Sequence, residues 1–241
     1  MTAAHPLDGR TALVTGASRG IGAAAARALA LAGARVALVA RSADALAALA
    51  SELGAAHTAV AADLATAAGV DAVVAAVRGW AGGVPDILVN NAGVFAPRPI
   101  PEQDPDDFAH ILRVNLESPF RLVHAFFPGM VRRGSGHIVT VGSIADRRAR
   151  AANAAYSASK FGLRALHESL RAEAHGTGVR ASLVSPSAVD TPIWAPVEPR
   201  LGRDYPARSA MLTADDVARA IAFVVSQPAH VDIDELRLSH S

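Results

Sequence analysis

Tyr156 and Lys160 are the two residues of this sequence whose types and spacing best suit proton transfer. Four residues apart on a helix, their side chains project from the same face and can reach one ligand. A free tyrosine hydroxyl has a pKa of about 10 and is a poor base at neutral pH. Because a nearby ammonium group favours the phenolate, the pair predicts that Lys160 brings the pKa of Tyr156 into the working range of an acid–base catalyst. The alternative is an ordinary surface pair on a helix.

A glycine-rich turn offers a second kind of chemistry, the binding of phosphate. Residues 15–22 carry three glycines with the spacing Gly-x3-Gly-x-Gly. They lie between an expected strand and an expected helix, where glycines let the backbone approach a pyrophosphate and helix N-terminal amides face it. A tight turn without a ligand is the plainer interpretation. The residues of this turn expected to contact the bound ligand are Gly16, Ser18, Arg19, Gly20, Ile21 and Gly22.

Short β-branched runs alternate along the chain with longer periodic runs rich in Ala and Leu. Strands are expected at 11–15, 35–40, 58–62, 87–90, 137–141, 179–184 and 235–238, and helices at 21–32, 43–53, 70–80, 106–132, 154–175 and 215–226. Pro119 could kink the longest helix. The alternation implies right-handed crossovers and a parallel sheet covered by helices on both faces. We expect one doubly wound α/β domain over residues 1–241, with the Pro-rich segment 186–212 as a lid.

Composition and charge argue against several other functions. Lys+Arg 23 and Asp+Glu 22 give a net charge of +1, which provides no electrostatic reason to expect nucleic acid or an anionic membrane as partner. The sequence has no cysteine and therefore no disulfide, thiolate zinc site or cysteine nucleophile, and no metal is expected. Residues 1–6 are too short for a signal peptide and no apolar run approaches the roughly 18 residues of a membrane span, so a cytoplasmic location is expected.

Five motifs follow one another along the chain: the glycine turn, Asn90-Asn91-Ala92-Gly93, Asn115, Ser143 and the Tyr156–Lys160 pair. In this order they resemble the short-chain dehydrogenase/reductase family, and they span most of the sequence. The resemblance implies a Rossmann fold with about seven strands in the order 3-2-1-4-5-6-7. It also implies hydride transfer between a nicotinamide and a small-molecule carbonyl or alcohol, by a homodimer or homotetramer assembled through helices 106–132 and 154–175.

The same resemblance assigns catalytic roles to four residues. Tyr156 would be the proton donor and acceptor, Lys160 would also bind the nicotinamide ribose, and Ser143 would hydrogen-bond the substrate oxygen. Asn115 would position a water that relays protons from the lysine. From the residues alone, Asn115 could simply cap or kink its helix, and Ser143 could be only a turn residue.

The end of the second strand distinguishes the two nicotinamide cofactors, because an acidic residue there binds the ribose 2′-hydroxyl and a basic one accommodates a 2′-phosphate. Here the strand is followed by Arg41 and Ser42, and Arg19 in the glycine turn is a second cation. A guanidinium pairs with phosphate in a forked geometry, so NADP(H) is expected, unless both arginines are solvated surface charges. The resemblance adds further cofactor contacts at Asp63, Leu64, Asn91, Ala92, Gly93, Pro186, Ser187, Val189 and Thr191.

One position departs from the family pattern, which usually has glycine where this chain has Ser187. A serine limits backbone freedom beside the nicotinamide. The substrate pocket is expected between residues 94–98, 144–152 and 188–205. Three arginines in the second segment, Arg147, Arg148 and Arg150, could attract an acidic substrate or be solvated.

Other functions on this fold stay open from the sequence. A non-catalytic NADP(H)-binding regulator would share the fold but has no need of the four catalytic residues together. A sugar-nucleotide epimerase or dehydratase normally carries a larger C-terminal domain, and an enoyl reductase spaces its tyrosine and lysine more widely. The function we expect is that of an NADP(H)-dependent ketone or aldehyde reductase or alcohol dehydrogenase.

Overall fold

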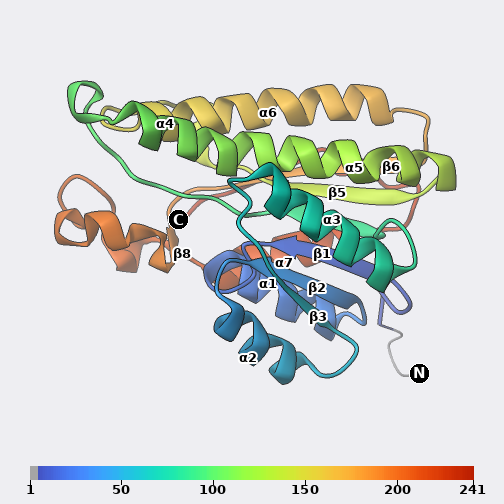
Figure 1. The fold of residues 1–241 in the computed structure, drawn as a ribbon. Helices are drawn as coiled ribbons and strands as arrows, with labels where there is room; N and C mark the ends of the chain where they lie inside the picture. The colour runs from blue at the N-terminus through green and yellow to red at the C-terminus, as the bar shows by residue number, and fades with distance from the viewer. Residues whose placement is uncertain (1–4) are drawn as a thin grey trace.

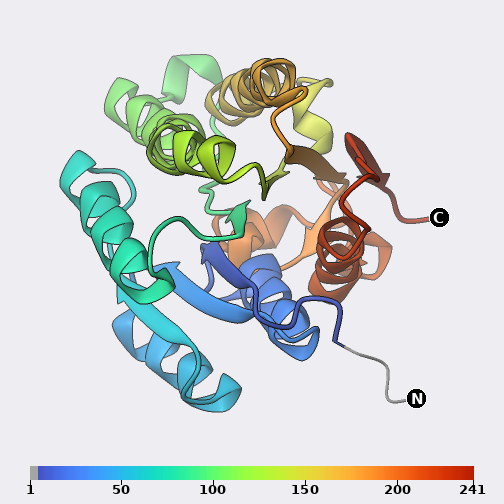
Figure 2. The same ribbon diagram turned by 90° about the vertical axis from the view of Figure 1, so that its right-hand side faces the viewer.

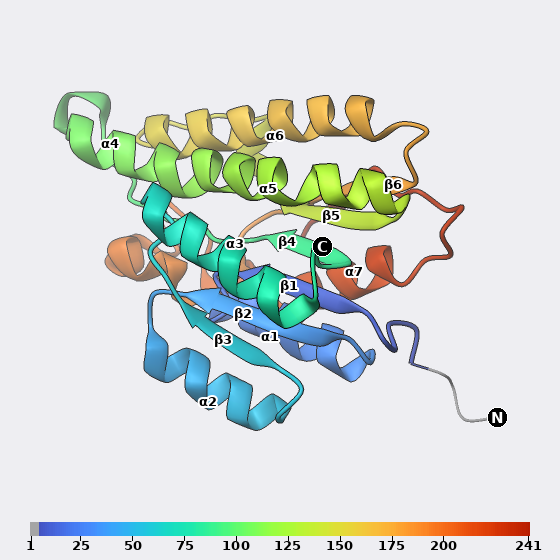
Figure 3. The same cartoon turned by 45° about the vertical axis from the view of Figure 1, so that its right-hand side comes forward.

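The computed structural model describes residues 5–241. Its main sheet has seven parallel strands in the order β3-β2-β1-β4-β5-β6-β9 (Figures 1 and 3). The expected doubly wound sheet is confirmed, and its last strand is β9 because two short strands, β7 and β8, pair with each other outside it. The strands are β1 (Thr11–Thr15), β2 (Arg35–Ala40), β3 (Thr58–Ala61), β4 (Ile87–Asn90), β5 (Gly136–Val141), β6 (Val179–Pro186), β7 (Val189–Asp190), β8 (Leu212–Thr213) and β9 (Glu235–Leu238).

Helices cover both faces of this sheet (Figure 2). Helices α1, α2 and α7 pack on one face, and α3, α5 and α6 pack on the other, each group over its own apolar core. The helices are α1 (Gly20–Leu31), α2 (Ala43–Leu53), α3 (Ala67–Ala81), α4 (Pro105–Leu112), α5 (Ser118–Arg133), α6 (Ala154–Ala174) and α7 (Ala214–Val225). Within the described residues, no helix is both long enough and apolar enough to cross a membrane.

The middle residues of β1 are apolar because they contribute to both cores. In β1, Ala12 and Val14 belong to the core under α1 and α7, whereas Leu13 belongs to the core under α3, α5 and α6. All three side chains are fully buried. Successive side chains of a strand point to opposite faces, so a strand covered on both sides needs an unbroken apolar run. That run places β1 in the interior, paired with β2 on one side and β4 on the other.

The longest expected helix, 106–132, is interrupted just before Pro119, the residue at which the sequence suggests a kink. The structure has α4, then a π-helical turn at Arg113–Glu117, then α5. The N–H of Ser118 donates to the carbonyl of Arg113, five residues back. Pro119, in the first turn of α5, has no N–H to give to the carbonyl of Asn115, four residues back, so the α-helical pattern cannot hold there. The π-helical turn that results lies before the proline and has Asn115 at its centre.

Segment 186–212 lies beyond one end of the main sheet, on the side away from the N-terminus (orange in Figure 1). Its base is closed by the parallel pairing of β7 with β8, which the sequence did not predict. Between these strands are two 3-10 helical stretches, Pro192–Arg200 and Arg208–Ala210. Trp194 and Tyr205 of the segment pack with Phe95 from the main body. The segment is thus folded against the molecule and is not a structureless loop.

Two buried histidines, His137 on β5 and His167 on α6, make the fold sensitive to acid. Burial lowers the pKa of His137 to about 3 and that of His167 to about 4, with nearby arginines acting in the same direction. In the unfolded chain both pKa values return to about 6.5. Because the unfolded chain takes up protons that the fold cannot, stability is full above about pH 6.5 and falls as the pH drops towards the folded-state values. At pH 5 each histidine is expected to reduce the free energy of unfolding by about 2 kcal/mol.

Urea unfolding at pH 7.5 and pH 5 measures this loss. The variant His167→Leu is expected to remove about half of it, because neither ring nitrogen of His167 has a hydrogen-bond partner among the described residues. Exposed His175 provides the control, and His175→Gln should leave the difference unchanged. Equal stability of the wild-type protein at the two pH values would refute the role of the buried histidines.

Candidate functional site

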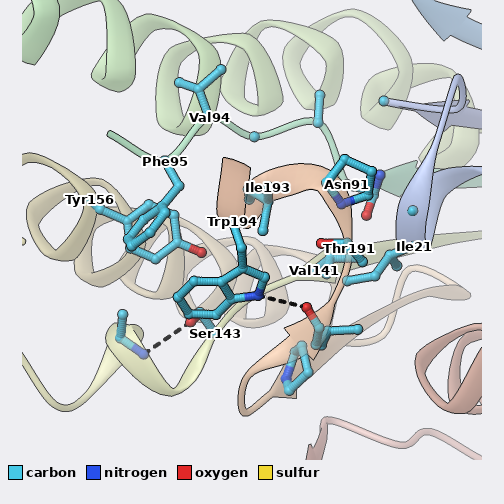
Figure 4. A pocket seen from close by; sticks show the side chains of 18 of the residues that line it. Ile21, Asn91, Val94, Phe95, Val141, Ser143, Tyr156, Thr191, Ile193 and Trp194 are labelled. Atoms are coloured by element: carbon cyan, nitrogen blue, oxygen red, sulfur yellow. Dashed lines mark hydrogen bonds between the residues drawn. The ribbon is translucent and has the colours of Figure 1, made fainter. Parts of the chain in front are cut away.

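A cavity of about 690 Å³ opens where the strand order reverses, between the carboxyl ends of β1 and β4. Figure 4 shows some of the side chains that line it. Ligands of open α/β sheets bind at such switch points. The cavity wall includes these residues predicted from the sequence: Gly16, Ser18, Arg19, Gly20, Ile21, Arg41, Ser42, Asp63, Leu64, Asn91, Ala92, Gly93, Ser143, Tyr156, Lys160, Pro186, Ser187, Val189 and Thr191. Two predicted residues, Gly22 and Asn115, lie behind the wall rather than in it.

The glycine turn is shaped by close backbone approach. Gly16 and Gly20 adopt φ angles of 67° and 55°, in the left-handed region that favours glycine. A Cβ on Gly22 would lie 2.1 Å from the carbonyl oxygen of Gly16, so no side chain fits there. Gly22 therefore forms the turn without facing the cavity. The N-cap residue of α1, Arg19, makes no capping bond with its side chain in the described structure, and the first amides of the helix face the cavity end.

Thr15 and Asn91 join the glycine turn to the end of β4. The Thr15 hydroxyl donates to the carbonyl of Val89 (3.1 Å) and accepts from the backbone N–H groups of Asn91 and Ala92 (3.0 Å each). The Asn91 amide donates to the carbonyl of Thr15 (2.8 Å). These bonds hold the glycine turn after β1 to the loop after β4, on either side of the switch point. Thr15 therefore has a structural function that the sequence motif did not reveal.

Arg19 and Arg41 are exposed at one end of the cavity, and neither makes an ion pair with any described residue. Ser42 beside them caps α2, with its hydroxyl accepting from the N–H of Ala45 (3.4 Å). Asp63 also lines the cavity, and its carboxylate accepts from the N–H of Ala65 (3.0 Å). This end of the cavity thus presents two guanidinium groups available to an anion.

Tyr156 and Lys160 share one wall of the cavity, as their spacing predicts. The Lys160 ammonium donates to the carbonyl of Val141 (2.9 Å) and lies 5.8 Å from the centre of the Tyr156 ring. Burial lowers the pKa of Lys160 to about 8, so the ammonium form prevails at neutral pH. Burial raises the pKa of Tyr156, while the Ser143 hydroxyl acts in the opposite direction. The pKa of Tyr156 is thus raised where the sequence predicts that it is lowered, because desolvation outweighs the hydrogen bond from Ser143.

Ser143 follows β5 and begins a short 3-10 turn, Ile144–Asp146. Its hydroxyl oxygen accepts from the N–H of Ala145 (3.2 Å). A hydroxyl carries one proton and two lone pairs, so this bond leaves its proton available to the Tyr156 oxygen or to an oxygen in the cavity. Figure 4 shows Ser143 close to Tyr156 on the same side of the cavity. The pair can direct two O–H donors at one carbonyl oxygen.

The side chain of Asn115 is fully buried and does not reach the cavity. Its amide donates to the carbonyl of Val94 (3.0 Å) and to the Ser159 hydroxyl (3.0 Å), and its oxygen accepts from the N–H of Val94 (2.8 Å). Ser159 in turn donates to the carbonyl of Tyr156 (2.7 Å). Asn115 therefore clamps the first turns of α6 to the loop after β4.

Aromatic rings surround the Tyr156 ring. Phe95 packs edge-on against Tyr156, with ring centres 5.0 Å apart, and Trp194 and Tyr205 contact Phe95 at 5.4 and 6.2 Å. The indole N–H of Trp194 donates to the carbonyl of Val189 (2.8 Å), which fixes the ring over the cavity (Figure 4). A substrate near Tyr156 would be held largely by apolar and aromatic contacts.

The three arginines after Ser143 do not act together. Arg148 and Arg150 line the cavity, are exposed, and make no ion pair within the described chain. Arg147 is directed elsewhere and pairs with Asp146 and Glu235. The expectation of a three-arginine cluster is therefore corrected to two cavity arginines and one structural arginine.

Ser187 causes no backbone strain where the family usually has glycine. Among the described non-glycine residues only Ala152 has a positive φ, of 59°. The N–H of Ser187 donates to the carbonyl of Leu238 in β9 (2.8 Å). A side chain is thus compatible with the backbone conformation at this point.

Sequence reasoning missed several polar residues at the site. Asn153, at the start of α6, lines the cavity with a buried side-chain oxygen that has no partner among the described residues. Asp146 and Ser185 lie under the Ser143 turn. The spacing of Ser143 and Asp146 is that of a capping box, which could have pointed to Asp146. Nothing local in the sequence marks Ser185 or Asn153.

Comparison with known proteins places this architecture in a family. The family model described as short chain dehydrogenase matches residues 10–202. The chain is 32% identical over 229 residues to an uncharacterized oxidoreductase of Staphylococcus epidermidis, covering 95% of this chain and 96% of that protein. It is 34% identical to a 3-oxoacyl-acyl-carrier-protein reductase of Salmonella typhimurium over 226 residues, 92% of each protein.

Solved structures agree with this assignment. A metagenomic short-chain oxidoreductase in complex with NADP superposes with a TM-score of 0.83 at 36% identity, covering 98% of this chain and all of that one (100%). A gluconate 5-dehydrogenase of Burkholderia cenocepacia, in complex with NADP and tartrate, superposes with a TM-score of 0.85 at 31% identity, covering 98% and 96%. This protein therefore belongs to the short-chain dehydrogenase family of oxidoreductases.

Proposed function

We propose that the protein transfers a hydride between NADP(H) and a carbonyl or alcohol substrate, acting as a ketone or aldehyde reductase or as an alcohol dehydrogenase. The observation that carries this proposal is the convergence of Ser143, Tyr156 and Lys160 on one wall of a cavity. The other end of the same cavity carries the glycine turn and two unpaired arginines. A proton-transfer group and a phosphate-binding end in one cavity suit a nicotinamide enzyme.

The residues present fit NADP(H). The glycine turn suits close approach to a pyrophosphate, because Gly16 and Gly20 line the cavity in a left-handed conformation and Gly22 lets the turn close against the carbonyl of Gly16. Arg19 and Arg41 are the groups we assign to the 2′-phosphate, with Asp63 near the adenine. Two related structures with bound NADP support the choice. When bound, the cofactor would supply or accept the hydride, which no side chain of this protein can do.

In reduction, Tyr156 would donate its hydroxyl proton to the substrate oxygen while Ser143 donates a second hydrogen bond to it. The raised pKa of Tyr156 keeps that proton in place until charge develops on the oxygen. Lys160 would hold the ribose and restore the proton. The side-chain amide of Asn115 already donates to Val94 and Ser159. We therefore propose that the main-chain carbonyl of Asn115, which receives no hydrogen bond from Pro119, orients the relay water.

We further propose that residues 1–241 work as one domain, with segment 186–212 as the substrate lid. The contacts of Trp194 and Tyr205 with Phe95 support this assignment. A homodimer or homotetramer through the faces of α5 and α6 is also proposed. Phe120 on α5 and Phe161 on α6 support it, because their side chains are 53% and 44% exposed.

Incubation of the purified protein with NADPH or NADH and a panel of aldehydes, ketones and keto acids tests the proposal. We expect loss of absorbance at the nicotinamide band with at least one carbonyl, and faster with NADPH. Tight NADPH binding without turnover of any carbonyl would instead favour a non-catalytic regulator of the same fold.

The cavity arginines predict a preference within that panel. Arg148→Ala is expected to raise KM for phenylglyoxylate by about tenfold, because an unpaired guanidinium at the cavity can bond its carboxylate. The neutral analogue phenylglyoxylamide has the same aromatic ketone without the charge and should show little change in KM. Steady-state kinetics with both compounds measures the effect, and equal changes in the two KM values would dispose of an anion subsite.

A further inference from the structure

A buried carboxylate, Asp146, lies directly beneath the turn that carries Ser143. Its side chain is 0% exposed. One carboxylate oxygen, Oδ2, accepts from the Ser185 hydroxyl on β6 (2.5 Å) and from the N–H of Ser143 (3.4 Å). A Cβ on Gly142 would lie 2.7 Å from the same oxygen, so the glycine leaves the space that this carboxylate occupies. Asp146 therefore joins the Ser143 turn to the sheet from below.

Asp146 is held from the other side by a chain of ion pairs. The Nε of Arg147 donates to Oδ1 of Asp146 (2.8 Å), and its Nη2 donates to Glu235 on β9. Arg164 on α6 donates to both oxygens of Glu235 (3.3 and 3.2 Å). The side chains of Arg147, Arg164 and Glu235 are only 27%, 27% and 23% exposed. Three elements distant in sequence thus meet in a network with four partly or fully buried charged groups at its centre. Exposed Glu168 and Arg237 pair with its outer members, Arg164 (2.8 Å) and Glu235 (3.8 Å).

Loss of any one charged group from this network is expected to destabilise the others. Removing one partner of a buried ion pair leaves an uncompensated charge in a poorly solvated place. The backbone of the turn is also fixed to the sheet, since the N–H of Gly142 donates to the carbonyl of Val184 (2.8 Å). Displacement of the Ser143 backbone, from which its hydroxyl projects, would therefore break contacts to the carboxylate beneath it.

Asp146 also acts electrostatically on the proton-transfer pair. Its negative charge raises the pKa of Tyr156 and opposes the lowering of the pKa of Lys160 by burial. Loss of that charge would lower both pKa values. The charged and titratable groups around Asp146 are Arg147 from its own turn, Arg164, Lys160 and Tyr156 from α6, and Glu235 from β9.

We propose that Asp146, held by Arg147 and Glu235, is a positioning residue that fixes the Ser143 hydroxyl for the reaction. Arg147 serves this network rather than the substrate, in contrast to the neighbouring Arg148. The proposal rests on the proposed carbonyl chemistry for its kinetic consequences. Its structural part, the anchoring of the Ser143 turn, does not depend on which reaction the protein performs.

The first test compares Asp146→Asn with Asp232→Asn. Asp232 is a matched control because it joins the same helix, α6, to the same C-terminal segment through Arg171 (2.9 Å). For Asp146→Asn we expect kcat for carbonyl reduction to fall about tenfold to a hundredfold, since small misplacements of reacting groups cost that much. The pH midpoint of kcat should move to lower pH, and NADPH affinity should stay within about twofold of wild type. Asp232→Asn should change none of these.

A second variant and a measurement without turnover complete the test. Glu235→Gln removes the remote end of the network at a partly exposed position and should lower kcat in the same direction, though less. Amide hydrogen exchange of residues 143–147 should become faster in Asp146→Asn and in Glu235→Gln, but not in Asp232→Asn. Amide hydrogen exchange can be measured even if the wild-type protein reduces no carbonyl. Such a lack of activity would overturn the proposed function but not the positioning role of Asp146. Unchanged exchange in 143–147, or unchanged kcat and pH midpoint in an active enzyme, would overturn the positioning role.

Discussion

Tyr156→Phe is expected to lower kcat for carbonyl reduction by about a thousandfold while the affinity for NADPH stays within about threefold. The substitution removes only the hydroxyl that would donate the proton. The ring itself keeps its edge-on contact with Phe95 at 5.0 Å, so the cavity wall is preserved. Steady-state kinetics gives the change in kcat, and fluorescence titration of NADPH gives the affinity.

The sequence supplies a matched control, since Tyr205 is its only other tyrosine. Tyr205 lines the same cavity, and its hydroxyl accepts from Arg200 (3.2 Å) rather than serving the reaction centre. Tyr205→Phe should therefore reduce kcat by less than about tenfold. If Tyr156→Phe is no more damaging than Tyr205→Phe, Tyr156 is not the proton donor, and a binding protein that needs no proton transfer becomes the better account.

Loss of both Arg19 and Arg41 to alanine is expected to lower the preference for NADPH over NADH by about a hundredfold. A hydrogen bond to a charged group contributes roughly 1.5–3 kcal/mol, so each arginine is expected to account for about tenfold or more. Because both side chains are exposed and solvent screens their charges, we expect each contribution to lie at the lower end of that energy range. The measured quantity is the ratio of kcat/KM for NADPH to kcat/KM for NADH.

The effect should be confined to the phosphorylated cofactor. kcat/KM for NADH is expected to change little, because that cofactor lacks the 2′-phosphate. Arg132→Ala is a suitable control, since Arg132 is an exposed arginine of α5 outside the main cavity. Equal losses with NADPH and NADH in the double variant would show that the arginines serve the fold and not the phosphate.

The sequence predicts the layers of this fold well because each strand and helix carries its own periodic signal. The apolar runs of β1 and β2 and the Ala-rich pattern of α1 are local, and the structure confirms these elements to within a residue or so. The interruption at Asn115 was missed because a π-turn has no apolar period of its own. Strands β7 and β8, of two residues each, are too short to show alternation.

In the candidate site, too, the features with a local sequence signal could be predicted and those that depend on distant residues could not. The glycine turn and the Tyr156–Lys160 pair are contiguous motifs, so their place in the cavity could be foreseen. The different directions of Arg147 and Arg148 could not be foreseen, because one of the two partners of Arg147, Glu235, lies 88 positions away in the chain. The raised pKa of Tyr156 likewise depends on burial by segments distant in sequence.

Transfer of an isotopic label tests the central claim most directly. Each stereoisomer of NADPH carrying deuterium at C4 of the nicotinamide would be incubated with the best ketone of the panel, and the alcohol product would be examined by mass spectrometry. The account predicts that one of the two stereoisomers places deuterium on the carbinol carbon and that Tyr156→Phe suppresses this transfer. Alcohol without deuterium from either stereoisomer, or NADPH consumption without alcohol, would contradict hydride transfer between the nicotinamide and the carbonyl.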